Sequence, residues 1–370
     1  MQLFIKNYKC FLEQKIEFGK LTVLAGANSA GKSSTIQALL LMRVALEQEQ
    51  ANKKTVPVNG EYCLALGLVK DLINRDIDAD EVSFILKDNQ ITLCAIHLNF
   101  DKEIPYDFVL KPTQKAEFLT GDFYYLNAER IGPRLEYKVD NFKHAGYNGE
   151  YAVQIIANKD LKTDKNKSFS IHIANTLRDQ AHAWLEYVTP GVIIQGADVY
   201  DKIRTAQMTI SNTTPTNVGF GVSYVLPIIV NGLLAKPNSI FIVENPEAHL
   251  HPSAQSRIGR FLAKIAATGV NVIVETHSEH VINGIRIATL RSSDEDEYAI
   301  HTDDVIINFF HKEKVDFFDK GKNSQPQVKK IKITESGNLD DFPRDFFDQL
   351  QQDLAELIAL KRARKEGGKQ

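Results

Sequence analysis

Residues 26–33 read Gly-Ala-Asn-Ser-Ala-Gly-Lys-Ser, residue types and a spacing that suit the binding of a phosphate chain. The two glycines let the backbone curl so that successive N–H groups point inward at phosphate oxygens. Lys32 can bring a positive charge to the terminal phosphates, and Ser33 can offer a hydroxyl to Mg²⁺ at the start of a helix. This phosphate loop is therefore predicted to bind ATP with Mg²⁺. The predicted nucleotide-binding residues here are Gly26, Ala27, Asn28, Ser29, Ala30, Gly31, Lys32, Ser33 and Ser34.

A carboxylate stands at the end of a second apolar run. Residues 240–243, Ile-Phe-Ile-Val, are typical of a buried strand, and Glu244 follows directly. Ligands of parallel sheets bind at the edge where the carboxyl ends of the strands lie. We therefore expect Glu244 beside the phosphate loop, where it would hold Mg²⁺ together with Ser33. The plainer alternative is a strand end whose carboxylate only caps a helix.

The elements that must position these groups alternate along the chain. Residues 1–46 predict strand, turn, strand, phosphate loop and helix, and residues 217–285 predict helices between fully apolar strands. Such alternation indicates a mainly parallel sheet flanked by helices. Residues 47–210 contain shorter strand-like runs and a lysine-rich loop, without a repeat or a sustained heptad. We expect an α/β head formed by 1–46 and 211–370, with 47–210 as a mixed α+β insert packed closely on it and no coiled-coil arm.

Composition narrows the class of protein. The chain has 370 residues, a formal net charge of −3, 43% hydrophobic and 25% charged residues, which argues against a body that is basic all over. Cys10, Cys63 and Cys94 show no CxxC spacing, so neither a disulfide framework nor a cysteine zinc site is expected. Apolar runs stay short of the roughly 18 residues that span a bilayer. These features predict a soluble, cytoplasmic protein without a membrane partner.

The residues after Glu244 resemble a known group of ATPases. Residues 245–252 read Asn-Pro-Glu-Ala-His-Leu-His-Pro, and residues 276–278 read Thr-His-Ser after the next apolar strand. Together with the phosphate loop they resemble the ATPase heads of the SMC, RecF and ABC class, and within it the overcoming-lysogenization-defect (OLD)-like ATPases of bacterial anti-phage systems. The resemblance covers 1–46 and 217–285. Residues 337–347 resemble a short tail of an uncharacterised subgroup of these ATPases.

The resemblance implies an ABC/SMC-type head and a composite site. Two heads would associate head to tail, as a homodimer or within a higher homo-oligomer, and enclose two ATP molecules. The loop at 219–223, here the signature loop, would bring Gly221 and Ser223 to the partner's nucleotide, although it departs from the usual LSGGQ and could be a plain glycine turn. His277 matches the switch histidine that touches the γ-phosphate. A buried structural histidine is the competing interpretation.

One position departs from the class in a way that bears on catalysis. Where a second acidic residue usually orients the attacking water, this chain has Asn245, and an amide cannot act as a general base at neutral pH. Either Glu247 reaches the water, or the protein hydrolyses ATP slowly and acts as a nucleotide-gated clamp. Because phosphoryl transfer depends mainly on positioning and charge stabilisation, we expect slow hydrolysis. The predicted catalytic residues are Lys32, Glu244, Glu247 and His277.

Other residue clusters have plainer explanations. A transition-metal site is not expected, because the H-E-x-x-H spacing is absent from the cluster His249, His251, Glu275, His277, Glu279 and His280. The basic run 361–365 suits a solvated helix end better than a DNA contact. Glu129 and Arg130, with Arg134, stand in an irregular segment and either reach the nucleotide or DNA or lie at the surface.

Three functions remain to be compared. The leading hypothesis is an OLD-like, nucleotide-switched ATPase of anti-phage defence that controls a separate nuclease or toxin, since no Toprim-like acidic cluster follows His277. The second is a RecF-like clamp that uses ATP to load on double-stranded DNA. The third, an ABC transporter motor, is weakened by the long segment between the phosphate loop and the signature loop.

Overall fold

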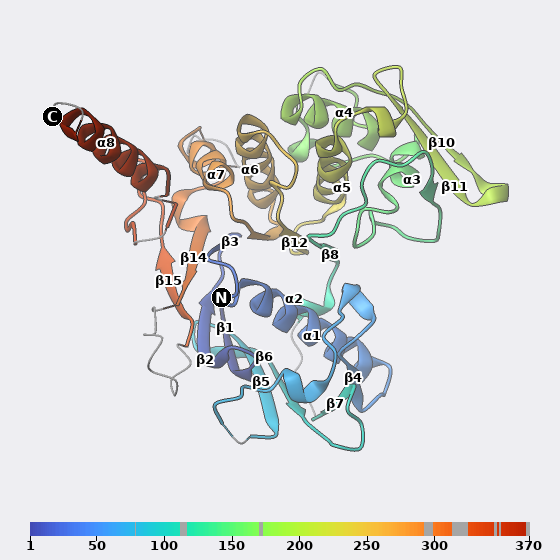
Figure 1. The fold of residues 1–370 in the computed structure, drawn as a ribbon. Coiled ribbons are helices and arrows are strands. Elements are labelled where there is room, and N and C mark those ends of the chain that lie inside the picture. The colour runs from blue at the N-terminus through green and yellow to red at the C-terminus, as the bar shows by residue number, and fades with distance from the viewer. Residues whose placement is uncertain are drawn as a thin grey trace.

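The computed structural model describes residues 1–77, 79–111, 117–169, 173–291, 299–312, 325–343, 346–347 and 349–367. Within them the chain forms a central sheet with helices above it, a second sheet below it, and a small sheet at one end (Figure 1). None of the described helices is long and apolar enough to cross a bilayer.

The central sheet carries the phosphate loop. Its strand order is β15-β14-β3-β13-β12-β8, and every neighbouring pair is parallel except β14 with β15. The strands are β3 (Leu21–Gly26), β8 (Phe123–Leu126), β12 (Ile240–Glu244), β13 (Asn271–Glu275), β14 (Val305–His311) and β15 (Gln327–Ile331). The predicted run of apolar strands is thus confirmed, with β13 inserted between the phosphate-loop strand and the strand that ends in Glu244.

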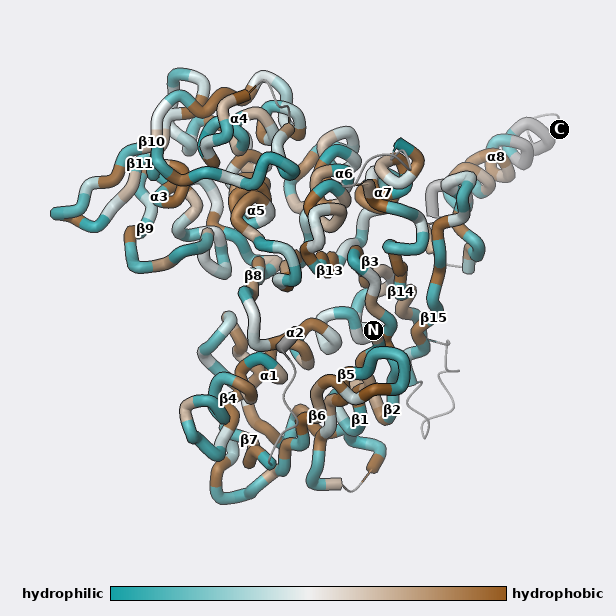
Figure 2. The backbone as a smooth tube through the Cα atoms, turned by 180° about the vertical axis from the view of Figure 1, so that it is seen from behind, coloured by the Kyte–Doolittle hydropathy of each residue, from teal (hydrophilic) through white to brown (hydrophobic). Residues whose placement is uncertain are grey.

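Alternation along the central strands divides the interior into two cores. Phe241 and Val243 of β12 join one core with α5 (Phe220–Leu234), α6 (Pro252–Ala267) and α7 (Glu279–Arg291). Ile240 and Ile242 face the other core, which contains α1 (Lys32–Gln50) and the second sheet. Because successive strand side chains point to opposite faces, fully apolar strands need cover on both sides. The hydrophobic residues of α5 and the central strands appear brown in Figure 2.

The second sheet is wholly antiparallel, in the order β2-β1-β5-β6-β7-β4. Its strands are β1 (Gln2–Tyr8), β2 (Phe11–Glu17), β4 (Thr55–Pro57), β5 (Glu81–Asp88), β6 (Ile91–Asn99) and β7 (Asp107–Leu110), with the short α2 (Glu117–Thr120) close to α1. The expectation of a mainly parallel protein therefore holds only for the central sheet. In the second sheet β5 pairs directly with β1, and this pairing is antiparallel.

The stretch 47–210 is not a separate insert. Its first half supplies four strands of the antiparallel sheet, and β8 forms an edge of the central sheet. Its second half forms α3 (Ala152–Ala157), α4 (Leu177–Val188) and a small sheet of β9 (Tyr137–Lys138), β10 (Ile194–Tyr200) and β11 (Thr205–Ile210), packed on α5. The expected boundaries near 46 and 210 thus cut through shared sheets and cores, because strand pairing joins residues far apart in the chain.

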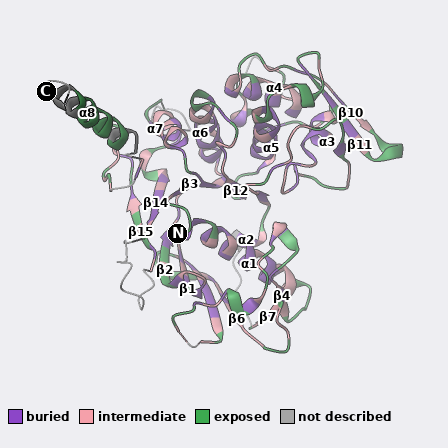
Figure 3. Ribbon diagram, in the orientation of Figure 1, coloured by how far each residue is buried: buried purple, intermediate pink, exposed green. Residues whose placement is uncertain are grey.

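Two helices have features that bear on their packing. Helix α5 begins at Phe220 and contains Pro227. In the last helix, α8 (Gln349–Gly367), Leu354, Leu357 and Ile358 are about half exposed. In Figure 3 α8 projects from the body with its described side chains exposed. The short 3-10 turns lie at Glu61–Cys63, Val69–Asp71, Lys165–Lys167, Asp201–Ile203, Pro215–Asn217 and Thr302–Asp304.

Candidate nucleotide site

The phosphate loop connects β3 to α1, and its geometry requires glycine at positions 26 and 31. Gly26 has φ 129° and a Cβ there would lie 2.0 Å from the carbonyl oxygen of Phe310. Gly31 has φ 110°, and a Cβ would lie 2.4 Å from the ring of Phe11. Ser29 also adopts a left-handed conformation, with φ 59°. The loop therefore has the curled backbone that directs N–H groups at an anion.

The side chain of Lys32 turns back toward the start of the phosphate loop. Its ammonium donates to the carbonyl oxygens of Gly26 at 2.9 Å and Ala27 at 2.8 Å, and only 3% of the residue is exposed. Burial lowers the pKa of Lys32, whereas the charges of Glu275 and Glu247 act in the opposite direction. The cation is thus held on the inner side of the loop, where its charge can stabilise phosphate oxygens.

Ser33 contacts a carboxylate that the sequence did not assign to the nucleotide. Its hydroxyl donates to Glu275 at 3.0 Å to Oε1 and 3.3 Å to Oε2, and Glu275 is 4% exposed. Burial and the nearby charge of Glu244 raise the pKa of Glu275 to about 7, although the charge of Lys32 and the hydrogen bond from Ser33 act in the opposite direction. A hydroxyl beside carboxylate oxygens is a hard-oxygen donor set that fits Mg²⁺.

Glu244 lies at the end of β12 as predicted, but it has other partners. Its Oε1 accepts a hydrogen bond from the hydroxyl of Tyr125 at 2.7 Å. Burial raises the pKa of Glu244, while the hydrogen bond from Tyr125 and the charge of Arg130 lower it. Glu244 pairs in register with Glu275, so both side chains leave the sheet on the same face. The role of Glu244 as a Mg²⁺ ligand stays a prediction.

The backbone after Glu244 is held by a buried arginine. Nη1 of Arg130 donates to the carbonyl oxygen of Glu244 at 2.7 Å, and Nη2 donates to that of Asn245. Arg130 is 4% exposed, and its burial lowers its pKa to about 10. Of the two alternatives for Arg130, the structure therefore excludes the surface, and the guanidinium binds protein carbonyls.

Asn245 adopts a left-handed conformation with φ 46°, and its N–H donates to the carbonyl oxygen of Glu275 at 2.8 Å. Its Oδ1 is buried and has no hydrogen-bond partner among the described residues. The backbone of Asn245 therefore joins the two strand ends that carry Glu244 and Glu275. An amide there can orient a neighbouring group but offers no base.

Glu247 holds the Thr-His-Ser segment, residues 276–278, here the switch segment. Its Oε2 accepts from the hydroxyl of Thr276 at 2.8 Å, and its Oε1 accepts from the backbone N–H of His277 at 2.7 Å. Both oxygens of Glu247 are thus already engaged with the switch segment, which weakens the account in which Glu247 orients water. The side chain of His277 is exposed, so it is not a buried structural histidine. Partial burial and the charge of Lys32 lower the pKa of His277.

The signature loop lies at the same edge of the central sheet. Gly219 caps α5, and a Cβ on Gly221 would lie 2.9 Å from the carbonyl oxygen of His249, just beyond β12. Ser223 lies inside the first turn of α5, 7% exposed, where its hydroxyl interacts with Tyr137. The serine therefore points into the protein, whereas Phe220 beside it is 58% exposed.

Comparison with known families decides the class. The model of a family described as "AAA ATPase domain" matches residues 1–186, half of the chain, including the phosphate loop. The chain belongs to the AAA ATPase family. A model described as "AAA domain, putative AbiEii toxin, Type IV TA system" matches residues 117–283, and a "Protein of unknown function (DUF3696)" matches 300–357. No curated protein matches the chain in sequence.

One solved structure supports the fold of this AAA ATPase. An SMC head bound to the C-terminal winged-helix domain of ScpA has a TM-score of 0.50 and 11% identity, with 90% of this chain and 98% of that chain covered. The SMC head of Thermotoga maritima is also 11% identical, with 85% and 95% covered and a TM-score of 0.40. The first likeness shows the head fold of the SMC/ABC class. With the AAA match, it makes the protein a nucleotide-dependent ATPase.

The sequence of the AAA ATPase contains a signal for Glu275. Glu275 ends the apolar run 272–274 in the way that Glu244 ends 240–243. In the sequence it also stands within a histidine-rich cluster. Two apolar strands that each end in glutamate predict two carboxylates at one sheet edge, and the structure brings them together.

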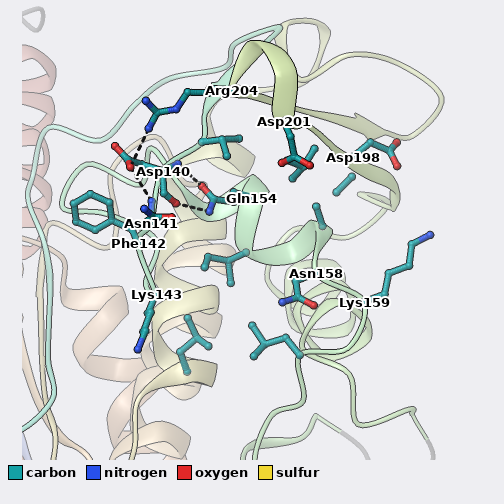
Figure 4. Close-up of a pocket in the computed structure, with 17 residues that line it drawn as sticks. Asp140, Asn141, Phe142, Lys143, Gln154, Asn158, Lys159, Asp198, Asp201 and Arg204 are labelled. Atoms are coloured by element: carbon teal, nitrogen blue, oxygen red, sulfur yellow. Dashed lines mark hydrogen bonds and ion pairs between the residues drawn. The ribbon is translucent and has the colours of Figure 1, made fainter.

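A cavity of this AAA ATPase lies away from the nucleotide site. It measures about 1080 Å³ and lies between α3, β10 and residues 139–143 (Figure 4). Asp140 and Arg204 form an ion pair of 3.0 Å at its rim, and Gln154 donates to the carbonyl oxygen of Asp140. The lining contains none of the predicted site residues.

Proposed function

We propose that this ATPase is a nucleotide-operated switch in defence against phage. Two copies associate head to tail around ATP and Mg²⁺ and hydrolyse the ATP slowly. In this way they control a separate effector. The effector would be a nuclease or a toxin. The protein would act in the cytoplasm without a membrane partner. Lys32 would stabilise the terminal phosphates, Ser33 would hold Mg²⁺, and His277 would contact the γ-phosphate.

One observation carries the association of two heads. The N-terminus of α5, a helix of 15 residues, lies at the same sheet edge as the phosphate loop, and Gly219 gives it no side-chain cap. Its exposed Phe220 lies against His249, with ring centroids 5.6 Å apart. An uncapped helix N-terminus favours an anion, so the phosphates of a second copy's ATP suit it. The buried Ser223 leaves this contact to backbone N–H groups.

The control of an effector has support of a different kind. The description of the family matched over residues 117–283 names a toxin and a TA system, which supports a link to toxic activity. An SMC head of the same fold is bound to a domain of ScpA, so a head of this fold can act with a separate protein. Slow hydrolysis is supported by Asn245 at the position of the usual acidic residue and by the engagement of both Glu247 oxygens.

The test measures steady-state ATP hydrolysis and, by light scattering, the molar mass of the purified protein with ATP and with ADP. Wild type is expected to turn ATP over slowly and to self-associate with ATP. Lys32→Ala removes the phosphate cation and should abolish both effects. Lys159→Ala removes an exposed lysine from the turn after α3 and is the matched control, which should change neither.

Further measurements separate this proposal from the alternative functions and mechanisms. Glu247→Gln that keeps ATP binding but loses hydrolysis would restore the account in which Glu247 orients water. Strong stimulation by double-stranded DNA would favour the RecF-like clamp. ATP binding without any turnover or self-association would refute the proposed switch.

A further inference from the structure

The order of strands decides which carboxylate lies nearest the phosphate loop. β13 pairs directly with β3, whereas β12 pairs with the far side of β13. Neighbouring strands are about 5 Å apart, so Glu244 leaves the sheet about 10 Å from β3 and Glu275 about 5 Å from it. The register of the strands does not bring Glu244 closer to β3, because Glu275 is paired with both Glu244 and Leu24 at the same level.

Side-chain contacts agree with this order. Both oxygens of Glu275 lie within 3.3 Å of the Ser33 hydroxyl, the group that the phosphate loop offers to a metal ion. Glu244 instead accepts from Tyr125, on the edge strand β8. The backbone of Glu244 is also held by Arg130. Glu244 is therefore anchored away from Ser33, while Glu275 is anchored to it.

We propose that Glu275, and not Glu244, is the carboxylate that positions Ser33 and the Mg²⁺ ion of the bound nucleotide. Glu275 acts as a positioning residue through Ser33 and the metal's hydration shell, the outer-shell arrangement that Mg²⁺ prefers when phosphates supply its other ligands. The inference rests on ATP binding at the phosphate loop, as proposed above. It assigns to Glu275, at the end of β13, the metal role that the sequence predicts for Glu244.

The experiment is a Mg²⁺ titration of the equilibrium binding of a fluorescent ATP analogue to the full chain. Glu275→Gln should raise the Mg²⁺ concentration needed for half-maximal tight binding by about 10- to 100-fold, the usual effect of losing an outer-shell partner. Binding measured in EDTA should stay as in wild type, because Lys32 and the loop backbone are unchanged. Glu244→Gln should leave the Mg²⁺ dependence close to that of wild type.

A double-mutant cycle tests whether Glu275 acts through Ser33. If it does, the double variant Ser33→Ala with Glu275→Gln should need no more Mg²⁺ for half-maximal binding than the more strongly impaired of the two single variants. That result would be a clear departure from additivity. Glu275→Asp keeps the charge and should recover part of the Mg²⁺ dependence. A purely structural cap on α1 predicts a lower melting temperature with unchanged Mg²⁺ dependence, and that result would overturn the inference.

The two proposals fail in different ways. If wild type does not bind the analogue in Mg²⁺, the proposed nucleotide switch fails. If wild type binds but only Glu244→Gln shifts the Mg²⁺ titration, the switch stands and the assignment to Glu275 is wrong.

Discussion

At the residue scale, Arg130 shows how a buried cation can be held by protein carbonyl oxygens. Its guanidinium joins the carbonyl oxygens of Asn127, Glu244 and Asn245, and its carbon Cζ lies 5.4 Å from the ring centre of Tyr224. The fork geometry of arginine allows several acceptors at fixed angles, which lysine cannot match. Arg130 thereby connects the segment after β8 to the turn after β12.

The first prediction concerns this arginine. Arg130→Leu leaves buried carbonyl oxygens of Glu244 and Asn245 without donors, so the free energy of unfolding should fall by about 3 kcal/mol. Urea denaturation followed by circular dichroism measures it. Arg134→Leu removes an exposed arginine of the same segment and should change the free energy by less than about 0.5 kcal/mol. Equal effects of the two variants would mean that the Arg130 contacts contribute little.

At the element scale, the crossing of α6 and α7 depends on two glycines. A Cβ on Gly259 would lie 2.3 Å from the carbonyl oxygen of Val281, and one on Gly284 would lie 2.0 Å from that of Ser256. The two backbones therefore approach closely, as small residues permit. Since α7 begins at Glu279, directly after the switch segment, this crossing fixes the switch segment relative to the turn after β12.

Gly284→Ala is expected to force the two helices apart. Overpacking should exceed the gain in helix propensity and lower the free energy of unfolding by about 2 kcal/mol. Thermal unfolding by calorimetry is the measurement. The matched control is Gly196→Ala in β10, whose Cβ would meet its nearest atoms at an ordinary 3.9 Å. A melting temperature for Gly284→Ala equal to that of the control would contradict the tight crossing.

The helix α8 leads to a prediction of unchanged stability. Its described side chains, 352–361 and 364, are exposed, so they contribute little buried apolar area to the rest of the molecule. Truncation after residue 348 should leave the midpoint of thermal unfolding of the monomer unchanged within about 2 °C. Loss of several degrees would show that α8 is packed on the body in solution.

At the scale of the whole molecule, α1 and the central sheet hold two layers together. The antiparallel sheet and α1 share one core, and α5, α6 and α7 share the other. The nucleotide site lies at the carboxyl edge of the sheet between these layers, where the phosphate loop, the switch segment and the start of α5 meet. Ligand binding at that edge can therefore reach both layers.

Association of two heads should be sensitive to the exposed tip of α5. Phe220→Glu places a carboxylate where the phosphates of the partner's ATP are proposed to dock, so ATP-dependent self-association should weaken at least about tenfold, or 1.4 kcal/mol. Analytical ultracentrifugation with ATP measures it. Ile203→Glu, at an apolar position 63% exposed in the turn between β10 and β11, is the control and should associate as wild type does. Unaltered association of Phe220→Glu would place the interface elsewhere.

The sequence by itself determined the features that are local. The phosphate loop, the strand before Glu244 and the switch segment were predicted because each places its chemistry within a few consecutive residues. Their function lies in backbone curl, strand ends and the side chains beside them. The AAA family match and the head fold agree with that chemistry.

Only the tertiary structure decided which of these groups meet. Glu275 lies beside Ser33 because β13 enters the sheet between β3 and β12, a pairing of segments about 250 residues apart. Ser223 faces inward because α5 begins three residues before it and packs on the segment that carries Tyr137. Residues 47–210 belong to several layers because β5 pairs with β1 and β8 with β12. Long-range strand pairing and burial set these outcomes, and neither leaves a periodic signal in one short stretch of sequence.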